Sequence, residues 1–496
     1  MVSTRSTGGG SRRVSGSVRP GVSDSSTISL GDDEGPAGAT PADPLALVVA
    51  WSGVEPARVG EVALLGPAGT SWRLGRGASE GADWVRFARQ RPFALEPVGP
   101  VEGPAISREQ LHVQVRPDAL LITRSGRCPM LVAGCGVERA VLVPGDTLLL
   151  KSQLLLLCVR RSERMPAPRD FPAEARGAFG QPDALGILGE SPAAWRLREQ
   201  LAFLAKADAG VLITGASGSG KELVARAVHA LSRRRAGPFV ARNAATLPPG
   251  LVDAELFGHA RNFPNPGMPE RPGLLGEAER GTLFLDEIGE IEHALQAHLL
   301  RVLDDGEYHR LGDPRARRAD VRIVAATNRA PGALKHDFLA RLPLRLALPD
   351  LDERREDVPL LVRHLLRRAR GASPDLGPRF FDDDGEPRVD AALVDHLVRR
   401  AYTTHVRELD ALLWRAMTES PGDVVTLPAE LRAPLAPPPR PPGEDPTAEA
   451  IRASACAHGG NLAEVARALG LPSRYALYRL LKRLDLDVDE LRSAVR

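Results

Sequence analysis

The chain has 496 residues, of which 43% are hydrophobic and 26% are charged, and its formal net charge is +2. These values are typical of a soluble globular protein of about three domains, and they exclude a chain whose overall charge alone would direct it to nucleic acid. No apolar stretch approaches the roughly 18 residues of a membrane helix, so we expect no membrane partner. The four cysteines lack metal-ligand spacing, which indicates free thiols in a reducing compartment. We therefore expect a cytoplasmic protein.

The first 163 residues divide into a polar tail and a β-rich domain. Residues 1–43 are mostly Ser, Gly, Arg and Pro, and they cannot bury enough apolar surface to offset the entropy of ordering, so we expect a disordered tail. From 44 to 163, short β-type runs such as 46–51, 111–115 and 154–159 alternate with Gly and Pro. This pattern predicts an all-β sandwich.

Three short motifs lie within this predicted sandwich: Trp72-Arg73-Leu74-Gly75-Arg76-Gly77, Ile106-Ser107-Arg108-Glu109-Gln110-Leu111 and Pro144-Gly145-Asp146-Thr147-Leu148. Together they resemble a forkhead-associated (FHA) domain, a sandwich that binds phosphothreonine peptides. The resemblance implies a phosphopeptide site at Arg76, Ser107 and Arg108, with a phosphothreonine protein or a Ser/Thr kinase as partner. The chemistry agrees, because two guanidinium groups and a hydroxyl can donate charge-assisted hydrogen bonds to a phosphate dianion.

Two features of the FHA pattern are absent. The histidine expected three residues after Ser107 is Gln110, and the asparagine expected near 124–126 is missing. The alternative to phosphopeptide recognition is a sandwich that serves only packing or dimerisation.

A polar, Pro-rich linker is predicted at 164–184, and from 185 to 350 helical periods alternate with apolar strands, which predicts a parallel sheet covered by helices. Within this region, the apolar run 211–213 is followed by a glycine-rich turn and a helical stretch. The turn has the phosphate-binding spacing G-x-x-x-x-G-K and comprises Gly215, Ala216, Ser217, Gly218, Ser219, Gly220, Lys221 and Glu222. Its backbone N–H groups, the Lys221 charge and the helix N-terminus would together hold a polyphosphate.

A second motif supports the first. The predicted strand 281–285 ends at Asp286 and Glu287, which would supply one carboxylate for Mg²⁺ and another to orient an attacking water. The alternative is a glycine-rich turn that binds no nucleotide.

Further segments of the region extend the pattern: Ile187-Leu188-Gly189-Glu190-Ser191-Pro192, Asn243-Ala244-Ala245, Glu255-Leu256-Phe257-Gly258-His259, Ala325-Ala326-Thr327-Asn328-Arg329, Glu353-Arg354-Arg355-Glu356-Asp357-Val358 and Val406-Arg407-Glu408-Leu409. They resemble the AAA+ domain of NtrC-like bacterial enhancer-binding proteins, the activators that remodel sigma-54 RNA polymerase. The resemblance covers 185–432, with an α/β subdomain at 185–350 and a helical lid at 351–432. It also accounts for Glu222, since this family usually has Glu at that position.

The resemblance assigns roles to individual positions. Lys221 would bind phosphate, Asp286 would bind Mg²⁺ and Glu287 would orient the water that attacks ATP. Asn243 would restrain Glu287, Asn328 would sense the γ-phosphate, and Arg407 would contact it from the lid.

The resemblance also implies a homo-oligomeric ring, a hexamer or heptamer, in which an arginine of one subunit completes the site of the next. Arg341 matches one such position, and a solvated helix charge is the alternative for it. The other position is Lys335, whose ammonium lacks the planar fork that binds phosphoryl oxygens bidentately.

The largest departure from the family lies at 262–267. The family has Gly-Ala-Phe-Thr-Gly-Ala there, on a loop that touches the sigma factor, whereas this chain has Asn262-Phe263-Pro264-Asn265-Pro266-Gly267. The threonine is missing, and two prolines stiffen a loop that must move with the nucleotide. We therefore expect ATP hydrolysis to survive, with contact to polymerase altered or lost.

A Pro-rich spacer is predicted at 433–446, and helical spacing returns at 447–496 with Asn461 and Ser473 as N-caps. The segments 459–461 and 466–471 resemble the Fis-type helix-turn-helix that usually follows this ATPase, which implies binding to double-stranded DNA upstream of a promoter. The candidate DNA contacts, for which a solvated basic helix is the alternative, are Ser473, Arg474, Tyr478, Arg479, Lys482 and Arg483.

The predicted fold class is thus multi-domain: an all-β FHA-like sandwich, an α/β AAA+ P-loop domain with a helical lid, and an all-α helix-turn-helix. The predicted function is that of a signal-responsive transcriptional regulator. It would bind upstream DNA, assemble as a ring that hydrolyses ATP with Mg²⁺, and act on sigma-54 RNA polymerase. One alternative is a DNA-bound regulator that needs nucleotide only for assembly, and another is an AAA+ chaperone or unfoldase.

Overall fold

The computed structural model describes residues 43–432 and 448–457, except 78–80, 166, 249, 291–292, 330–333 and 335, together with single positions in the C-terminal region: Leu462, Val465, Ala468, Leu469, Leu477, Leu480, Leu481, Leu484 and Leu486. The tail predicted at 1–43, apart from Asp43, and the spacer predicted at 433–446 lie outside these residues. Within the described part of the chain, every helix is too short or too polar to cross a membrane.

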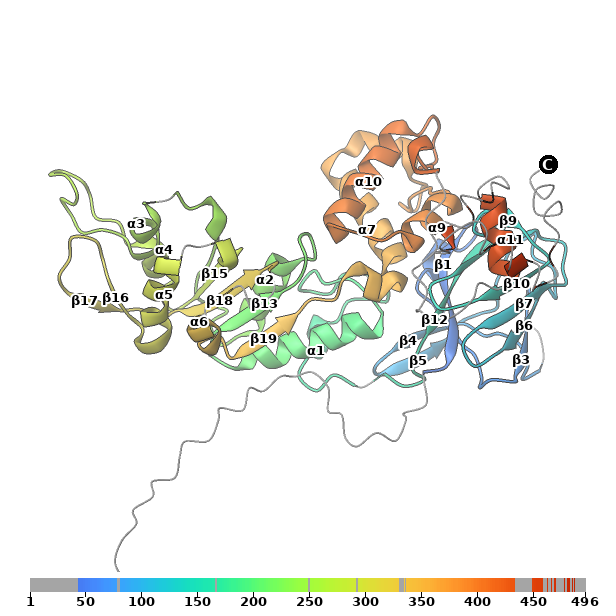
Figure 1. Ribbon diagram of the computed structural model, residues 1–496, viewed down its shortest axis with the longest axis horizontal. Coiled ribbons are helices and arrows are strands. Elements are labelled where there is room, and N and C mark those ends of the chain that lie inside the picture. The colour runs from blue at the N-terminus through green and yellow to red at the C-terminus, as the bar shows by residue number, and fades with distance from the viewer. Residues whose placement is uncertain are drawn as a thin grey trace, which may run out of the picture.

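A five-stranded parallel sheet forms the centre of the α/β unit (Figure 1). Its strands are β13 (Val211–Thr214), β14 (Phe239–Asn243), β15 (Thr282–Asp286), β18 (Arg322–Thr327) and β19 (Leu344–Ala347), in the order β14-β15-β18-β13-β19. Because neighbouring strands are parallel, their carboxyl ends meet at one edge of the sheet.

Helices cover both faces of this sheet. On one face, α1 (Pro192–Lys206) and α2 (Lys221–Leu231) pack against residues such as Phe284. On the other face, Leu283 and Leu285 pack against α3 (Val252–Phe257), α4 (Gly273–Glu277), α5 (His293–Asp305) and α6 (His336–Ala340). Burial on both faces explains the uninterrupted apolar runs of these strands.

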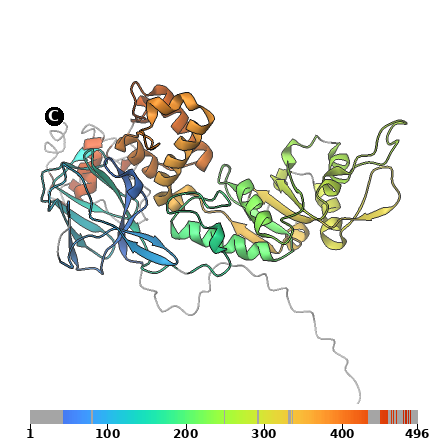
Figure 2. The same cartoon turned by 180° about the vertical axis from the view of Figure 1, so that it is seen from behind.

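A two-stranded hairpin extends from the α/β unit, at the end away from the sandwich (Figures 1 and 2). It consists of β16 (Glu307–His309) and β17 (Ala316–Arg318), which pair in antiparallel fashion.

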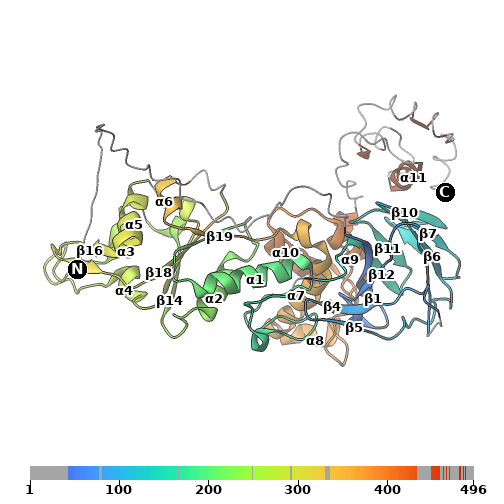
Figure 3. The same cartoon turned by 90° about the horizontal axis from the view of Figure 1, so that it is seen from below.

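The lid is a group of helices that follows β19. It comprises α7 (Val358–Ala372), α8 (Gly377–Phe380), α9 (Ala391–Arg399) and α10 (His405–Glu419). In α7 the buried residues recur at helical spacing, as Val358, Leu361, Val362 and Leu365 do, so the helix has one apolar face. The lid lies between the α/β unit and the sandwich (Figures 1 and 3).

The N-terminal domain is a sandwich of two antiparallel sheets. The larger sheet has the order β5-β4-β2-β1-β12-β11-β8-β9, and the smaller has the order β10-β7-β6-β3. The strands are β1 (Leu45–Ser52), β2 (Val62–Leu64), β3 (Ser71–Leu74), β4 (Ala88–Arg91), β5 (Ala94–Pro97), β6 (Leu111–Val115), β7 (Leu120–Arg124), β8 (Met130–Val132), β9 (Cys135–Gly136), β10 (Arg139–Leu142), β11 (Thr147–Leu150) and β12 (Leu154–Arg160). This arrangement agrees with the all-β prediction.

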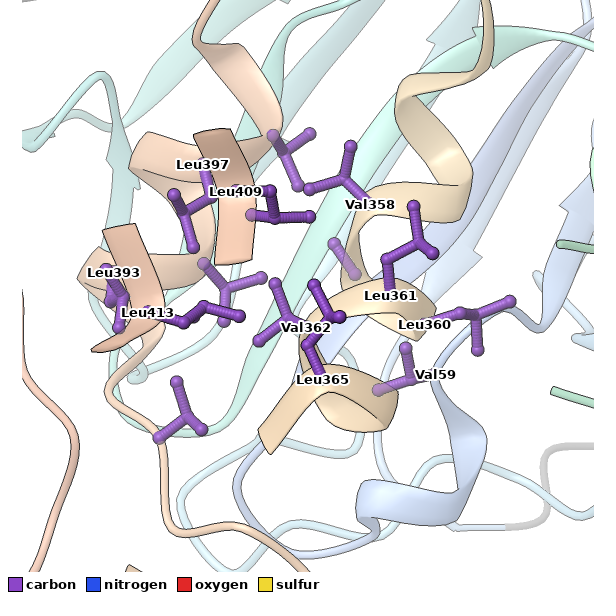
Figure 4. Packing of buried hydrophobic residues seen from close by; sticks show 14 of the residues in the cluster. Val59, Val358, Leu360, Leu361, Val362, Leu365, Leu393, Leu397, Leu409 and Leu413 are labelled. Carbon is purple, nitrogen blue, oxygen red and sulfur yellow. The ribbon is translucent and has the colours of Figure 1, made fainter. Parts of the chain in front are cut away.

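The two central strands of the larger sheet are buried on both faces. In β1, Leu45, Leu47 and Val49 face the interior of the sandwich. The alternate residues Ala46 and Val48 belong instead to a cluster with lid residues of α7, α9 and α10. Figure 4 shows Val59 of the sandwich beside Leu360 and Leu361 of the lid within this cluster. The sandwich and the lid therefore share one hydrophobic core.

The segment predicted as a linker, 164–184, joins the sandwich to the α/β unit and is packed along its course. Phe171 is 2% exposed, and its ring lies edge-on to the ring of Trp195 in α1, with 6.4 Å between centroids. Met165 and Ala175 belong to the same cluster, which also includes residues of α1 and α2.

In the C-terminal region, α11 (Ala448–Ala457) packs through Ile451 with the described leucines 462, 477, 480 and 481. Three cysteines can be assigned. Cys128 and Cys158 are free and buried, as expected, but Cys135 is disulfide-bonded, so the prediction of free thiols is wrong for Cys135.

Candidate functional site

The glycine-rich turn lies at the carboxyl edge of the sheet, between β13 and α2. Gly218 and Gly220 have φ angles of +77° and +102°, which favour glycine, and Gly220 is the N-cap residue of α2. The turn therefore presents the amino end of an 11-residue helix beside the end of a central strand.

Lys221 is 6% exposed, and its ammonium Nζ donates to two neutral carbonyls, those of Gly215 (3.0 Å) and Ala216 (3.2 Å). No carboxylate of the described residues forms an ion pair with it. The hydroxyl of the neighbouring Ser219 is also buried and lacks a hydrogen-bond partner within the described structure. A nearly buried cation without a counter-ion, next to an unsatisfied hydroxyl, has the properties of an anion site.

The last residue of the motif, Glu222, forms its contacts with α2. Glu222, at the start of α2, is exposed and accepts hydrogen bonds from Arg226 one helical turn on, at 2.7 and 3.1 Å. Its carboxylate therefore neutralises Arg226 and leaves the charge of Lys221 uncompensated.

Two carboxylates lie at the end of β15, which is separated from β13 by β18 in the sheet. Asp286 is the last residue of β15, and its Oδ1 accepts from the backbone N of Glu287 at 2.9 Å. Glu287 has a φ of +53°, a strained value for a residue with a side chain. Asn243 lies beside Asp286 in the register of β14 and β15, but its side-chain oxygen accepts from Ala245 N at 2.9 Å. The restraint of Glu287 by Asn243 thus stays a prediction.

Asn328 immediately follows β18 and is exposed at the same edge. It lines a cleft of about 550 Å³ together with Gly215 and Ala216 of the turn and with Asp350 and Glu353 at the start of the lid. The sheet thus brings the predicted residues of the turn, β15 and β18 to one edge, next to a cleft open to a small ligand.

The lid contacts the glycine-rich turn directly. Arg407, in the first turn of α10, donates from Nη1 to Ser217 Oγ at 3.0 Å. A Cβ at Gly218 would collide with the carbonyl of Thr404 and with Arg407, so only glycine permits this approach of the two backbones. The predicted lid arginine therefore reaches the turn.

The start of α10 is fixed by Glu408. Its burial would raise the pKa, but hydrogen bonds from the backbone of Thr403 and Thr404 and from Arg400 outweigh this and lower the pKa of Glu408 to about 2. The carboxylate is thus ionised at neutral pH and holds the segment that carries Arg407.

Arg341 lies just after α6, away from this edge, and forms an ion pair with Asp304 of α5 in the same chain. It is about half exposed, so it is available at the surface of the α/β unit. The other ring position, Lys335, lies outside the described residues.

The loop 262–267 closes on itself at the tip of the α/β unit. Asn262 Oδ1 accepts from Gly267 N at 2.9 Å, and Asn262 N donates to Met268 O at 2.9 Å. The Phe263 ring packs over Gly312 in the connection between β16 and β17, where a Cβ would collide with it. The aromatic side chain that the sequence singled out is therefore engaged with the chain's own hairpin.

A second cluster of polar groups lies on the loops of the sandwich. The backbone N of Arg76 donates to Ser107 O at 2.9 Å, and Ser107 Oγ accepts from the backbone N of Arg127 at 2.9 Å. Arg76, Arg108 and Arg127 are all exposed, and none of them forms an ion pair within the described residues. The predicted residues Arg76, Ser107 and Arg108 thus lie on neighbouring loops.

Gln110 organises these loops from beneath. It is fully buried, its Oε1 accepts from Ser107 N (3.1 Å) and Cys128 N (3.2 Å), and its Nε2 donates to Cys128 O (2.8 Å). The amide therefore fixes the Ser107 loop to Cys128, in the segment between Arg127 and β8. Gln110 was predicted only as a departure from the FHA pattern, and the signal for this role was a polar residue directly before the apolar strand β6.

The predicted DNA contacts cannot be placed in this way. Ser473, Arg474, Tyr478, Arg479, Lys482 and Arg483 lie outside the described residues.

Residues 187–349 match the profile of the sigma-54 interaction domain. The DNA-binding transcriptional regulator NtrC of Azospirillum brasilense is 34% identical over 447 residues, which cover 86% of each chain. The regulatory protein AtoC of Escherichia coli is 38% identical over 259 residues, which cover 50% of this chain and 54% of AtoC.

Among solved structures, NtrX from Brucella abortus in complex with ADP is 32% identical and covers 60% of this chain and 70% of its own, with a TM-score of 0.44. The assignment of the family rests on the sequence matches. With its sigma-54 interaction domain on the P-loop sheet and its match to NtrC over most of both chains, the chain belongs to the NtrC family of sigma-54-dependent transcriptional regulators with an AAA+ domain.

Proposed function

We propose that the chain is a signal-responsive regulator that binds DNA upstream of a promoter, assembles as an ATP-hydrolysing ring and acts on sigma-54 RNA polymerase. The observation that carries this proposal is the nearly buried Lys221 ammonium, which faces only neutral carbonyls at the amino end of α2. A polyphosphate is the ligand whose charge fits this site, because the helix end and the turn amides add to the field of the cation.

The residues at the sheet edge fit ATP and Mg²⁺. Asp286 would hold the metal together with phosphate oxygens, and the metal would neutralise charge on the transferred phosphoryl group. No group of three or more His, Cys, Asp or Glu side chains in the described part of the chain forms a metal site on its own.

The remaining residues would act on the nucleotide. Glu287 orients a water whose oxygen attacks the γ-phosphorus, while the bond to the bridging oxygen breaks and ADP and inorganic phosphate leave. Asn328 and Arg407 contact the phosphates from β18 and from the lid, which ties hydrolysis to the position of the lid.

Ring assembly follows from the same proposal. Arg341 would leave Asp304 and enter the site of a neighbouring subunit in a hexamer or heptamer, where its charge stabilises the phosphoryl group. The exposure of this arginine at the surface of the α/β unit supports the proposal.

An ATP-driven open-complex assay with sigma-54 polymerase tests this function. The full-length protein is expected to hydrolyse ATP and to yield fewer open complexes than a variant whose loop 262–267 carries the family's Gly-Ala-Phe-Thr-Gly-Ala sequence. The reason is that Phe263 is packed on the hairpin and the loop is closed by Asn262. Full activity of the unmodified chain would show that this loop still engages the polymerase.

The same loop favours a second candidate function, a DNA-bound regulator that has lost remodelling of sigma-54 polymerase and uses nucleotide only for assembly. The supporting observation is the self-closed loop. ATP-dependent ring formation without net hydrolysis or open complexes would favour this candidate. Binding to promoter DNA would distinguish both candidates from an AAA+ chaperone. The proposed contacts with this DNA are the basic residues 474, 479, 482 and 483.

For the sandwich, we propose recognition of phosphothreonine on a partner protein or kinase. Arg76 and Arg108 would donate to the phosphate, and Ser107 would add its hydroxyl, whose oxygen already accepts from Arg127 N while its proton is free to be donated. The support is the set of exposed arginines, which form no ion pair with any described residue, around a loop fixed by Gln110.

We expect Arg76→Ala to weaken binding of a phosphothreonine peptide by roughly 10- to 100-fold, because one charge-assisted hydrogen bond to a dianion is lost. Fluorescence anisotropy of a labelled peptide measures this. Arg116→Ala is the matched control, since Arg116 is exposed at the other end of β6. Equal binding by wild type and Arg76→Ala would leave the sandwich with a packing role only.

A further inference from the structure

The shared core between the sandwich and the lid is formed by strands that alternate between two environments. In β12, Leu154 and Leu156 belong to the sandwich interior, whereas Leu155 and Leu157 belong to the cluster that contains Leu361, Leu393 and other lid residues. All four β12 leucines are at most 1% exposed. The lid therefore buries its apolar face against β1 and β12, and a shift of the lid relative to the sandwich would expose that face to water.

Hydrogen bonds fix the orientation of the two parts. Trp51 Nε1 in β1 donates to Val389 O at 2.9 Å, and Thr147 in β11 is hydrogen-bonded to Asp395 in α9. Because apolar packing alone is not directional, these bonds set the register of α9 on the sheet.

A buried arginine extends this junction to the α/β unit. Arg161 directly follows β12 and is 2% exposed. Its Nε donates to Gln90 in the sandwich (2.7 Å), its Nη1 to Glu356 at the start of the lid (2.6 Å), and its Nη2 to the carbonyl of Glu190 just before α1 (2.8 Å). One guanidinium thus joins the sandwich, the lid and the α/β unit.

The partners of Arg161 are themselves held in place. Asp357, next to Glu356, accepts from the backbone N of Glu190 (2.8 Å) and from the N and hydroxyl of Ser191 (3.0 and 2.6 Å). The Glu190 carboxylate accepts from Trp195 Nε1 at 3.1 Å and pairs with Arg91 of the sandwich. The connection from β19 into the lid is therefore tied to the segment that enters α1.

These two segments border the cleft beside the glycine-rich turn, which is lined by Ala193 and Arg196 of α1 and by Asp350 and Glu353 of the connection. The carboxylates Asp286 and Glu287 lie at the end of β15, on the other side of β18 from the turn. A change in the Arg161 network would thus alter the cleft and the lid without touching the groups that act on the water.

We propose that Arg161, which lies outside the ATPase module, is a positioning residue for the nucleotide site, and that the sandwich and the lid move as one body whose orientation it sets. The consequence is that a ligand bound to the sandwich would act on nucleotide affinity through the lid. The proposal rests on the nucleotide binding proposed above.

The test compares full-length Arg161→Met and Arg161→Lys with wild type in ATP hydrolysis and in binding of a fluorescent ATP analogue with Mg²⁺. We expect Arg161→Met to raise KM and weaken binding by about tenfold, the effect of one charge-assisted hydrogen bond, with kcat changed less than twofold, and Arg161→Lys to recover part of the affinity. Arg160→Met is the matched control, because Arg160 bonds only within the sandwich and the segment before it, to Asp118, Pro117 and Asp43.

If Arg161→Met does not fold, Glu356→Gln provides a second test. Glutamine keeps the shape of the side chain and one hydrogen bond but removes the ion pair with Arg161. We expect this variant also to raise KM. A folded Arg161→Met with the KM of wild type overturns the inference, as does a fall in kcat at constant KM. Failure of the wild-type chain to bind the analogue would instead contradict the proposed function.

Discussion

Full-length protein carrying Lys221→Met is expected to bind ATP at least 100-fold more weakly than wild type. The ammonium of Lys221 is 6% exposed and bonds only to the carbonyls of Gly215 and Ala216, so its charge is available to the phosphates. Loss of a buried charge pair costs about 3 kcal/mol or more, which corresponds to two or more decades in affinity. Isothermal titration calorimetry with ATP and Mg²⁺ measures the change.

Lys206→Met is the control for this substitution. Lys206 is the last residue of α1, is exposed and pairs with Asp170, so its loss removes the same charge from a lysine outside the turn. Comparable losses in the two variants would mean that only the net charge of the chain matters. Wild-type affinity in Lys221→Met would exclude the glycine-rich turn as the phosphate site.

The second large effect is expected for Glu287→Gln, which should lower kcat for ATP hydrolysis by about 10²- to 10⁴-fold while ATP binding stays within a few-fold of wild type. The amide keeps the size of the side chain but loses the negative charge that orients the water. The strained φ of Glu287 at the end of β15 indicates that its position is imposed by the fold, and the substitution leaves that backbone unchanged.

Steady-state phosphate release and single-turnover binding together check this result. Glu279→Gln is the matched control, because Glu279 is exposed and precedes β15 at the opposite end of the strand. Undiminished phosphate release by Glu287→Gln would assign the water to another group, and loss of binding would show that Glu287 supports the fold of the site instead.

The parts of this site that are local in sequence could be predicted from it. A turn with glycines at fixed spacing between an apolar run and a helix, such as 215–221, requires a definite backbone path, and the structure has positive φ at Gly218 and Gly220. Strand β15 could also be predicted, because an apolar run that ends in two acidic residues is typical of a buried strand that brings carboxylates to the edge of a parallel sheet. The parallel pairing of the strands agrees with the predicted parallel sheet.

Contacts between distant segments were harder to foresee. Arg161, Glu356 and Asp357 are charged residues in polar stretches, and such residues are usually solvated, yet all three are buried or nearly so. Only the fold shows that each has a partner from another part of the chain. The segment 164–184 was assigned as a linker for the same reason, since the apolar residues that it buries, Met165, Phe171 and Ala175, are spread among prolines and charges.

One signal for the junction was present in the sequence. Strands with one solvated face alternate apolar and polar residues, whereas 154–158 and 45–50 are apolar at every position. This continuity indicates that a second layer covers the sheet, but it does not say which layer, because helices from anywhere in the chain could do so.

The double burial of β1 and β12 limits how this protein could have exchanged parts with its relatives. A sensor domain from another regulator would have a solvent-exposed surface at the place where this sandwich packs on the lid. It would leave the apolar faces of α7 and α9 exposed to water, and the chain would tend to precipitate. We therefore expect the sandwich and the lid to be inherited together, with recombination breakpoints after the lid or before the sandwich.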